Sequence, residues 1–386
     1  YTYYVDAMID QIIQDLMEQK GYTEQQANKI LFTKGLKIYS VQDMAIQQIC
    51  DEEFSNLANF PSGTQVGVDY ALSVQTTEGE TIHYGNDDFR SWYRQNFDSS
   101  FNLMFNDEDS ARSALASFKE SKTANGETIL GERISLAPQP QASLIIMDQA
   151  TGYVKAIVGG RGTKEASLTL NRATATTRQP GSTFKTLTLA MALEENVVDL
   201  NTGFYCGGNT TIEGQKIWCS KRVGHGQQNL TQAFANSCNP AFINIGLRVG
   251  NAKFYQYMQD FGLLEKTGID TTGEASGFAN SEIKYSTLAL ACYAFGQNFN
   301  VTPVALLAAQ CACVNGGYLY TPYLVEEITD QAGNVVSRHD ATPIRQVISA
   351  ETSALVRDIM EYEVTTGTGK NGQVAGYRIG GKTGTA

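Results

Sequence analysis

The stretch that decides the fold is Arg178-Gln179-Pro180-Gly181-Ser182-Thr183-Phe184-Lys185. Its Gln-Pro-Gly segment interrupts regular structure, and the apolar, helix-favouring residues that follow predict a helix with Ser182 in its first turn. Residues three apart lie on the same helix face, so Ser182 and Lys185 are expected to touch. Such a pair places a nucleophile beside its own base, provided that burial or a nearby cation lowers the pKa of the amine. The alternative is that Ser182 is a helix N-cap without a chemical role.

Composition limits the classes of protein that the chain can belong to. Its 386 residues suffice for two or three domains, and 42% hydrophobic with 18% charged residues is typical of a globular protein. The absence of an 18-residue apolar run predicts no membrane span. A net charge of −11 argues against a nucleic-acid partner, which needs a basic surface. Because the chain begins at Tyr1 and stops directly after Gly384-Thr385-Ala386, we expect it to be part of a longer protein.

Seven cysteines occur without C-x-x-C spacing, which disfavours a zinc site. The histidines, His83, His225 and His339, are scattered and are not predicted to bind metal. We therefore predict no metal and no cofactor. Cys206 and Cys219 flank a short segment, and both a disulfide and two buried thiols remain open there.

Hydrophobic periodicity divides the first part of the chain in two. Residues 1–59 read as a helical linker, and residues 60–135 as a small accessory α+β module. In the linker we expect helices at 3–19, 23–35 and 43–54 and a strand at 36–41. In the module we expect a hairpin that starts at 66–74 and helices at 87–105 and 108–121.

Residues 136–386 form the third predicted part. Residues 200–226 are Gly-rich and read as irregular. Besides the helix that carries Ser182, we expect helices at 230–235, 241–249, 285–295, 302–314 and 349–362. Strands are expected at 142–147, 153–158, 318–328, 334–338 and 377–385.

Two nucleotide-binding patterns near the end of the chain are rejected. Gly367-x-Gly369-x-x-Gly372 fits the dinucleotide fingerprint, but neither a preceding strand nor a following βαβ unit accompanies it. The run from Gly376 to Lys382 and Thr383 fits a phosphate-binding loop, but neither the helix nor the downstream Asp that such a loop requires follows. We read 377–385 instead as a strand facing a site, with its glycines allowing close backbone approach.

Three motifs occur in a fixed order: Ser182-x-x-Lys185, Ser237-x-Asn239 and Lys382-Thr383-Gly384. Together they are the signatures of penicillin-recognising serine enzymes. With them, the chain resembles a bifunctional (class A) penicillin-binding protein over nearly its whole length. The resemblance extends to Asn171-Arg172-Ala173-Thr174, His225-Gly226, Gly296-Gln297, Thr302-Pro303, Asn315-Gly316-Gly317 and Gly367-Thr368-Gly369. The chain departs from the pattern at Thr186, where such proteins commonly have Pro.

The resemblance implies an α/β (α+β) transpeptidase domain over 136–386, C-terminally incomplete, with a central antiparallel sheet flanked by helices. Residues 1–59 would follow a missing glycosyltransferase domain. The implied residue roles are nucleophile for Ser182, base for Lys185 and proton relay for Ser237. Substrate binding would fall to Asn239, Lys382, Thr383, Gly384 and Thr385, and the oxyanion hole to the backbone N–H groups of Ser182 and Thr385.

By the same resemblance the activity is that of a peptidoglycan D,D-transpeptidase, with penicillins acylating the same serine. The implied partners are stem peptides, β-lactams and other cell-wall synthesis proteins, at the extracytoplasmic face of the membrane and anchored through a missing N-terminal segment. A serine β-lactamase-like hydrolase is the nearest alternative, although no Glu-x-x-Leu-Asn-type segment follows Asn239 to supply a deacylating base. A non-catalytic assembly binder that docks through 60–135 is the other alternative.

Overall fold

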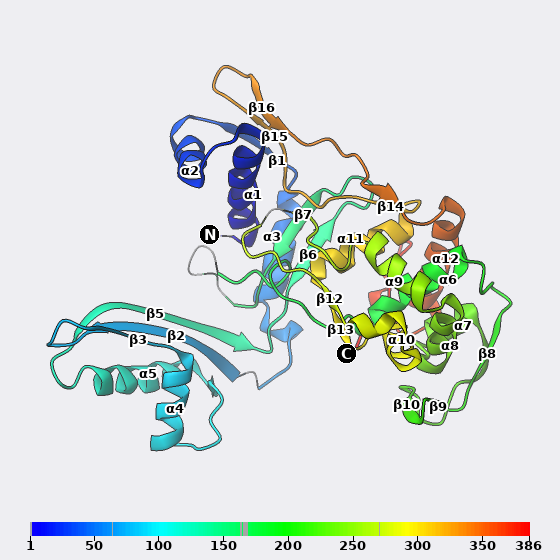
Figure 1. Ribbon diagram of the computed structural model, residues 1–386, viewed down its shortest axis with the longest axis horizontal. Coiled ribbons are helices and arrows are strands. Elements are labelled where there is room, and N and C mark those ends of the chain that lie inside the picture. Colours follow the sequence, from blue (N-terminus) through cyan, green and yellow to red (C-terminus); the bar gives the residue numbers. More distant parts are fainter. Residues whose placement is uncertain (1, 64, 163, 165–168, 270) are drawn as a thin grey trace. The chain divides into compact units, whose positions relative to one another are not determined.

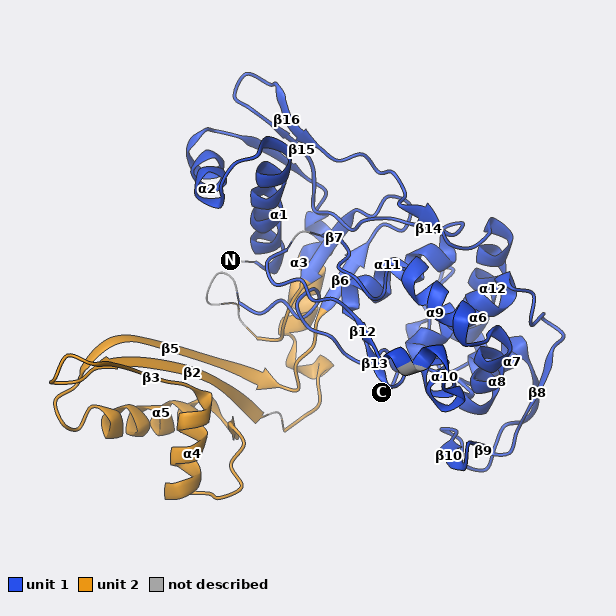
Figure 2. Cartoon of the chain, in the orientation of Figure 1, with its two compact units in different colours: residues 1–47, 144–157, 166–386 blue, residues 48–143, 158–165 orange. Residues whose placement is uncertain are grey.

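The computed structural model describes residues 2–63, 65–162, 164, 169–269 and 271–386 (Figure 1). The chain divides into two compact units (Figure 2). The first comprises residues 1–47, 144–157 and 166–386, and the second comprises residues 48–143 and 158–165. The predicted linker is thus divided between the units. The three-part division of the sequence stays a prediction about the organisation of the longer protein.

The second unit packs two helices on an antiparallel sheet (Figure 2). Alternate side chains of its central strand β2, Val68, Tyr70, Leu72 and Val74, are buried, as a half-buried strand requires. They meet the helix residues Phe89 and Phe118. The elements are β2 (Gln65–Gln75), β3 (Thr81–Tyr84), α4 (Asn86–Asn96), β4 (Met104–Phe105), α5 (Glu108–Lys122) and β5 (Thr128–Gln139).

Two elements of this unit differ from the sequence prediction. The helix predicted over 87–105 ends at Asn96, and the chain forms strand β4 at Met104–Phe105. Strand β5 was not predicted, because its first seven residues are exposed and show no apolar alternation. β5 is held instead by its long antiparallel pairing with β2.

The N-terminal helix of the first unit packs against a small antiparallel sheet of order β1-β15-β16. The Tyr4 hydroxyl donates a hydrogen bond to the carbonyl of Val154 at 2.8 Å. Gln11 Oε1 accepts one from the amide of Leu324 at 2.9 Å. The elements are α1 (Tyr3–Lys20), α2 (Glu24–Thr33), β1 (Lys37–Ser40), β15 (Val325–Thr329) and β16 (Val335–Arg338), with the hairpin β6 (Leu144–Met147) and β7 (Val154–Val158). Helix α3 (Met44–Ser55) begins in this unit and ends in the other.

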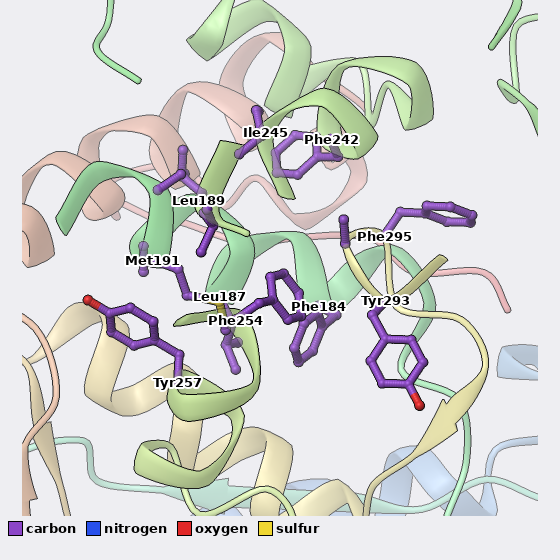
Figure 3. Packing of buried hydrophobic residues seen from close by; sticks show 14 of the residues in the cluster. Phe184, Leu187, Leu189, Met191, Phe242, Ile245, Phe254, Tyr257, Tyr293 and Phe295 are labelled. Atoms are coloured by element: carbon purple, nitrogen blue, oxygen red, sulfur yellow. The ribbon is translucent and has the colours of Figure 1, made fainter. Parts of the chain in front are cut away.

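The rest of the first unit is mainly helical, and its centre is α6 (Lys185–Glu194). Residues 185–193 of this helix are all buried. The surrounding core includes Phe242, Ile245 and Phe254 (Figure 3). The neighbouring helices are α7 (Leu230–Ala235), α8 (Asn239–Val249), α9 (Asn251–Asp260), α10 (Thr287–Tyr293), α11 (Pro303–Val314) and α12 (Ala350–Thr366), of which α9 was not predicted. A helix that is buried all round can hold a polar residue at its start in a fixed, largely dry position.

Short elements complete this unit. The 200–226 region, predicted to be irregular, contains regular antiparallel pairs. The strands are β8 (Gly203–Cys206) with β11 (Gly226–Asn229), β9 (Asn209–Ile212) with β10 (Gln215–Trp218), β12 (Phe278–Ala279) with β13 (Phe299–Asn300), and β14 (Tyr318–Leu319) with β17 (Arg345–Gln346). Single 3₁₀ turns are η1 (Leu57–Asn59), η2 (Gly181–Phe184), η3 (Ser281–Lys284) and η4 (Lys370–Gly372).

The strand predicted at 377–385 is wrong. In the part of the chain that the structure describes, this segment pairs with no strand, and it contacts α12 through the Gly381 amide and the Met360 carbonyl at 3.2 Å. A strand needs a neighbouring strand to pair with its backbone N–H and C=O groups.

None of the described helices combines the length and the apolar character needed to cross a membrane.

Candidate active site

Ser182 lies in the 3₁₀ turn η2, which continues directly into α6. The preceding Gly181 has a positive φ of 55°, which favours glycine. Its amide donates to the carbonyl of Gly296 at 2.9 Å, and a Cβ on Gly181 would collide with the carbonyl of Thr385. The turn is therefore held from two sides by segments that are distant in the sequence.

Lys185 is fully buried, and its amine faces a polar cluster. Lys185 Nζ lies 3.0 Å from Ser182 Oγ, as the helical spacing predicts. It also lies 2.8 Å from the Ser237 carbonyl, 3.2 Å from Ser237 Oγ and 2.6 Å from Asn239 Oδ1. A neutral amine has two N–H donors and one lone pair. It can donate to the two carbonyl-type oxygens, which leaves the lone pair for a serine hydroxyl.

The electrostatics of Lys185 favour this neutral form. Burial, reinforced by the positive charge of Lys382, lowers the pKa of Lys185 to about 7. A large fraction of the amine is then unprotonated near neutral pH. A partly neutral amine is the condition for a serine to be activated by a lysine.

The Ser237–Asn239 segment is a strained turn between α7 and α8. Ser237 has a φ of 48°, unusual for a residue with a side chain. The Ser237 amide donates to the Phe234 carbonyl at 2.9 Å. The side-chain amide of Asn239 donates to the Trp218 carbonyl at 3.0 Å, which points Oδ1 towards Lys185. The strain is concentrated where the turn presents its polar groups to the buried amine.

Lys382 is buried with a counter-charge that the sequence analysis missed. Its side chain is 1% exposed and that of Glu363 is 0% exposed, and Lys382 Nζ lies 3.8 Å from Glu363 Oε1. Burial lowers the pKa of Lys382 to about 8, and the Glu363 carboxylate opposes that change. The Thr368 hydroxyl donates to Glu363 Oε1 at 2.6 Å and lies 2.7 Å from Thr383 Oγ1. A polar chain therefore runs from α12 to the final segment.

The fold brings most of the predicted site residues into two adjoining groups. Ser182, Lys185, Ser237 and Asn239 form one hydrogen-bonded cluster. Lys382 and Thr383 form the second, with Glu363 and Thr368. A Cβ on Gly384 would collide with Thr183, and the carbonyl of Thr385 faces Gly181. The roles predicted for these residues, including the oxyanion hole, stay predictions.

Some residues of the site carried little signal in the sequence. Thr368 lies within Gly367-Thr368-Gly369, a motif that contributes to the family resemblance but for which the sequence predicted no role. Glu363 has no recognisable spacing to Lys382, and its contact depends on the packing of α12. A second cluster that the sequence did not predict adjoins the Ser237–Asn239 turn. It comprises the sulfur atoms of Cys206, Cys219 and Cys238 and a ring nitrogen of His225, which lie within 4.8 Å of one another.

Comparison with known proteins matches residues 142–386 to the family described as the penicillin binding protein transpeptidase domain. The chain is 46% identical over 212 residues to Stage V sporulation protein D of Bacillus subtilis, covering 54% of this chain and 33% of that protein. It is 28% identical over 234 residues to the peptidoglycan D,D-transpeptidase FtsI homolog of Mesostigma viride, covering 54% and 39%. The chain thus spans about a third of the length of these curated relatives.

A solved structure shows the same fold. It is the D,D-transpeptidase domain of a peptidoglycan glycosyltransferase from Eggerthella lenta, with a TM-score of 0.59 and 21% identity. The match covers 84% of this chain and 87% of that one. The predicted α/β transpeptidase fold is confirmed, with mixed helices and antiparallel strands.

Proposed function

Because the chain belongs to the penicillin-binding protein transpeptidase family, we propose that it is the transpeptidase part of a peptidoglycan D,D-transpeptidase. The observation that supports this most directly is the 3.0 Å approach of Lys185 Nζ to Ser182 Oγ, in a site where the pKa of the amine is lowered to about 7. The substrate class follows from the family and from the relative named as a peptidoglycan D,D-transpeptidase.

In the proposed reaction, Ser182 Oγ attacks the carbonyl carbon of the penultimate D-Ala of a stem peptide while Lys185 takes the hydroxyl proton. The backbone N–H groups of Ser182 and Thr385 stabilise the oxyanion, at about 3 kcal/mol per donor. Ser237 relays a proton to the departing D-Ala amine. An amine of a neighbouring stem peptide then attacks the acyl-enzyme, which releases Ser182 and forms the cross-link.

Substrate binding in this proposal uses the remaining predicted residues. The Lys382 ammonium and the hydroxyls of Thr383 and Thr385 bind the terminal carboxylate, a charge-assisted contact, beside Gly384. Asn239 holds the substrate amide. A penicillin carries a comparable carboxylate and an acylating carbonyl, so it enters the same site and stays bound to Ser182.

The wider context of the activity is also proposed. The whole protein works at the extracytoplasmic face of the cell membrane with other cell-wall synthesis proteins. The glycosyltransferase activity implied by the resemblance to the bifunctional class stays a prediction. Neither of the two curated relatives described above carries that activity in its name. Assay of glycan polymerisation by the full-length protein would test it.

The test of the proposed function is covalent labelling with a fluorescent penicillin. The full-length protein should be labelled once per chain, and Ser182→Ala should abolish the label. Ser113→Ala, at an exposed position of α5, is the control and should label normally. Persistent labelling of Ser182→Ala would contradict the assignment. Rapid, repeated turnover of nitrocefin would instead favour the hydrolase.

A further inference from the structure

A second group of reactive side chains lies directly behind the Ser237–Asn239 turn. Three sulfur atoms and one imidazole nitrogen, from Cys206, Cys219, Cys238 and His225, lie within 4.8 Å of one another. The three cysteines are at most 2% exposed, and Cys219 Sγ lies 3.5 Å from His225 Nδ1. Each residue comes from a different place: the end of β8, the residue after β10, the residue before β11 and the N-cap of α8.

The backbone segments that carry Cys206, Cys219 and His225 approach one another closely. Gly208 and Gly224 both have positive φ, and a Cβ at either would collide with backbone, that of Arg222 and Cys206 respectively. The Cys219 amide donates to the Gly208 carbonyl at 2.9 Å. Glycine is needed where backbones approach this closely. The packing of this loop therefore brings the Cys206, Cys219 and His225 side chains together.

The donor set matches one metal more closely than others. Three thiolates and one imidazole are a common structural zinc set, with Zn–S of about 2.3 Å and Zn–N of about 2.0 Å in a tetrahedron. Those bond lengths place ligand atoms about 3.5–3.8 Å apart. The observed cluster needs a small contraction to reach that geometry. Thiolates select zinc over magnesium or calcium.

The environment of the sulfur atoms also fits metal-bound thiolates. Cys238 is the N-cap of α8, where its side chain makes no capping hydrogen bond, and Cys219 Sγ has a ring nitrogen of His225 3.5 Å away. A disulfide would use two of the sulfurs and leave the third cysteine and the imidazole without a function. All seven cysteines lie in the described ranges and carry free thiols.

We propose that Cys206, Cys219, His225 and Cys238 bind one zinc ion in a closed, structural site. The lack of C-x-x-C spacing predicted no metal, whereas these ligands are 13, 6 and 13 residues apart in the sequence. All four tetrahedral positions are filled by protein, so the ion does not meet substrate.

The site connects to the turn beside Lys185 through the chain itself. Cys238 separates Ser237 from Asn239, and Cys219 follows Trp218, whose carbonyl holds the Asn239 amide. The zinc ion therefore ties the 206–225 region to the strained turn. Its ligands act as positioning residues for two groups that contact the buried amine.

The experiment is metal analysis of the full-length protein, purified under reducing conditions after growth with zinc. The expected result is one zinc per chain, and Cys219→Ser should remove at least nine tenths of it. Cys292→Ser, which changes a thiol of α10 outside the cluster, is the matched control and should keep the full equivalent. Equal zinc loss in both variants would overturn the proposal.

A spectroscopic measurement on the unaltered protein tests the same site without relying on Cys219→Ser, and so remains valid if that variant does not fold. Replacing zinc with cobalt(II) should produce the strong thiolate-to-cobalt absorption of a site with several cysteine ligands, and one equivalent of zinc should abolish it. Cobalt binding without that absorption would overturn the proposal. So would a Cys206–Cys219 or Cys219–Cys238 disulfide found by peptide mass spectrometry in metal-free, fully folded protein.

Discussion

The Lys382 ammonium lies 3.8 Å from the Glu363 carboxylate, and neither side chain reaches solvent to any extent. Breaking a buried pair by removing one partner leaves an uncompensated charge, which costs about 3–5 kcal/mol if the remaining group stays ionised. Lys382 can avoid part of this cost by losing its proton, because its pKa is already lowered to about 8. The pair therefore links the stability of the domain to the charge state of the site.

Glu363→Gln should destabilise the protein by about 1–3 kcal/mol and slow its acylation by penicillin several-fold at pH 8. Without the carboxylate the pKa of Lys382 falls below about 8, so less ammonium is present to bind the ligand carboxylate. Urea unfolding and the second-order rate of labelling measure the two effects. Glu361→Gln, on the same helix, removes an exposed ion pair with Arg378 and should cost much less stability, because solvent screens such a pair. Equal losses in both variants would show that the buried pair has no special role.

The rate of penicillin acylation should follow a bell-shaped pH profile. Its rising limb should have an apparent pKa near 7, because Lys185 must be neutral to accept the Ser182 proton. Its falling limb should lie near 8, where Lys382 loses the charge that binds the ligand carboxylate. Lys382→Arg keeps a cation that does not titrate in this range, so the falling limb should disappear while the rising limb remains. A profile that is flat between pH 6 and 9 in the unaltered protein would contradict both assignments.

Local patterns and ordered motifs sufficed to predict the two lysines and their neighbours. The Ser182–Lys185 contact follows from helical spacing alone, and Ser237 and Asn239 follow from the order of the motifs. Glu363 could not be found in this way, because its contact with Lys382 depends on how α12 packs against the final segment.

Three further features were not predicted correctly from the sequence. Strand β5 (Thr128–Gln139) has no apolar alternation and depends on its ladder with β2. The predicted strand at 377–385 contains three glycines, Gly380, Gly381 and Gly384, which weaken a strand, and it pairs with no strand among the described residues. The cysteine cluster is assembled from four segments whose spacing gives no sign that they converge. The β5 ladder and the cysteine cluster both join residues far apart in the chain, which local sequence patterns do not reveal.

The stability of the protein should also depend on pH through Lys185. Its pKa is about 7 in the folded protein and about 10.4 in an unfolded chain. Between these values the unfolded state binds more protons at this site, so the contribution of Lys185 to stability rises with pH. From pH 7 to pH 9 the rise is about 2 kcal/mol.

Comparison of the unaltered protein with Lys185→Met isolates this contribution. The free energy of unfolding, measured with urea, should favour the variant at pH 7, and its advantage should shrink by about 2 kcal/mol at pH 9. Lys253→Met changes a largely exposed lysine of α9 that pairs with Glu195, and its difference from the unaltered protein should stay constant over the same range. A constant difference for Lys185→Met as well would mean that the amine is not titrating in its buried position.

The glycine before the nucleophile provides the sharpest test of how the site is held. Gly181→Ala places a side chain at a φ of 55°, which costs about 1–2 kcal/mol, and drives its Cβ into the Thr385 carbonyl. The final segment must then move away from Ser182, taking its N–H and hydroxyl groups with it. We expect penicillin labelling to slow at least tenfold, because one lost oxyanion donor alone costs that much or more. Gly372→Ala has open space around its Cβ and no positive φ, so it should label at the normal rate. If Gly181→Ala lost stability but labelled normally, the Thr385 segment would have no part in stabilising the reaction at Ser182.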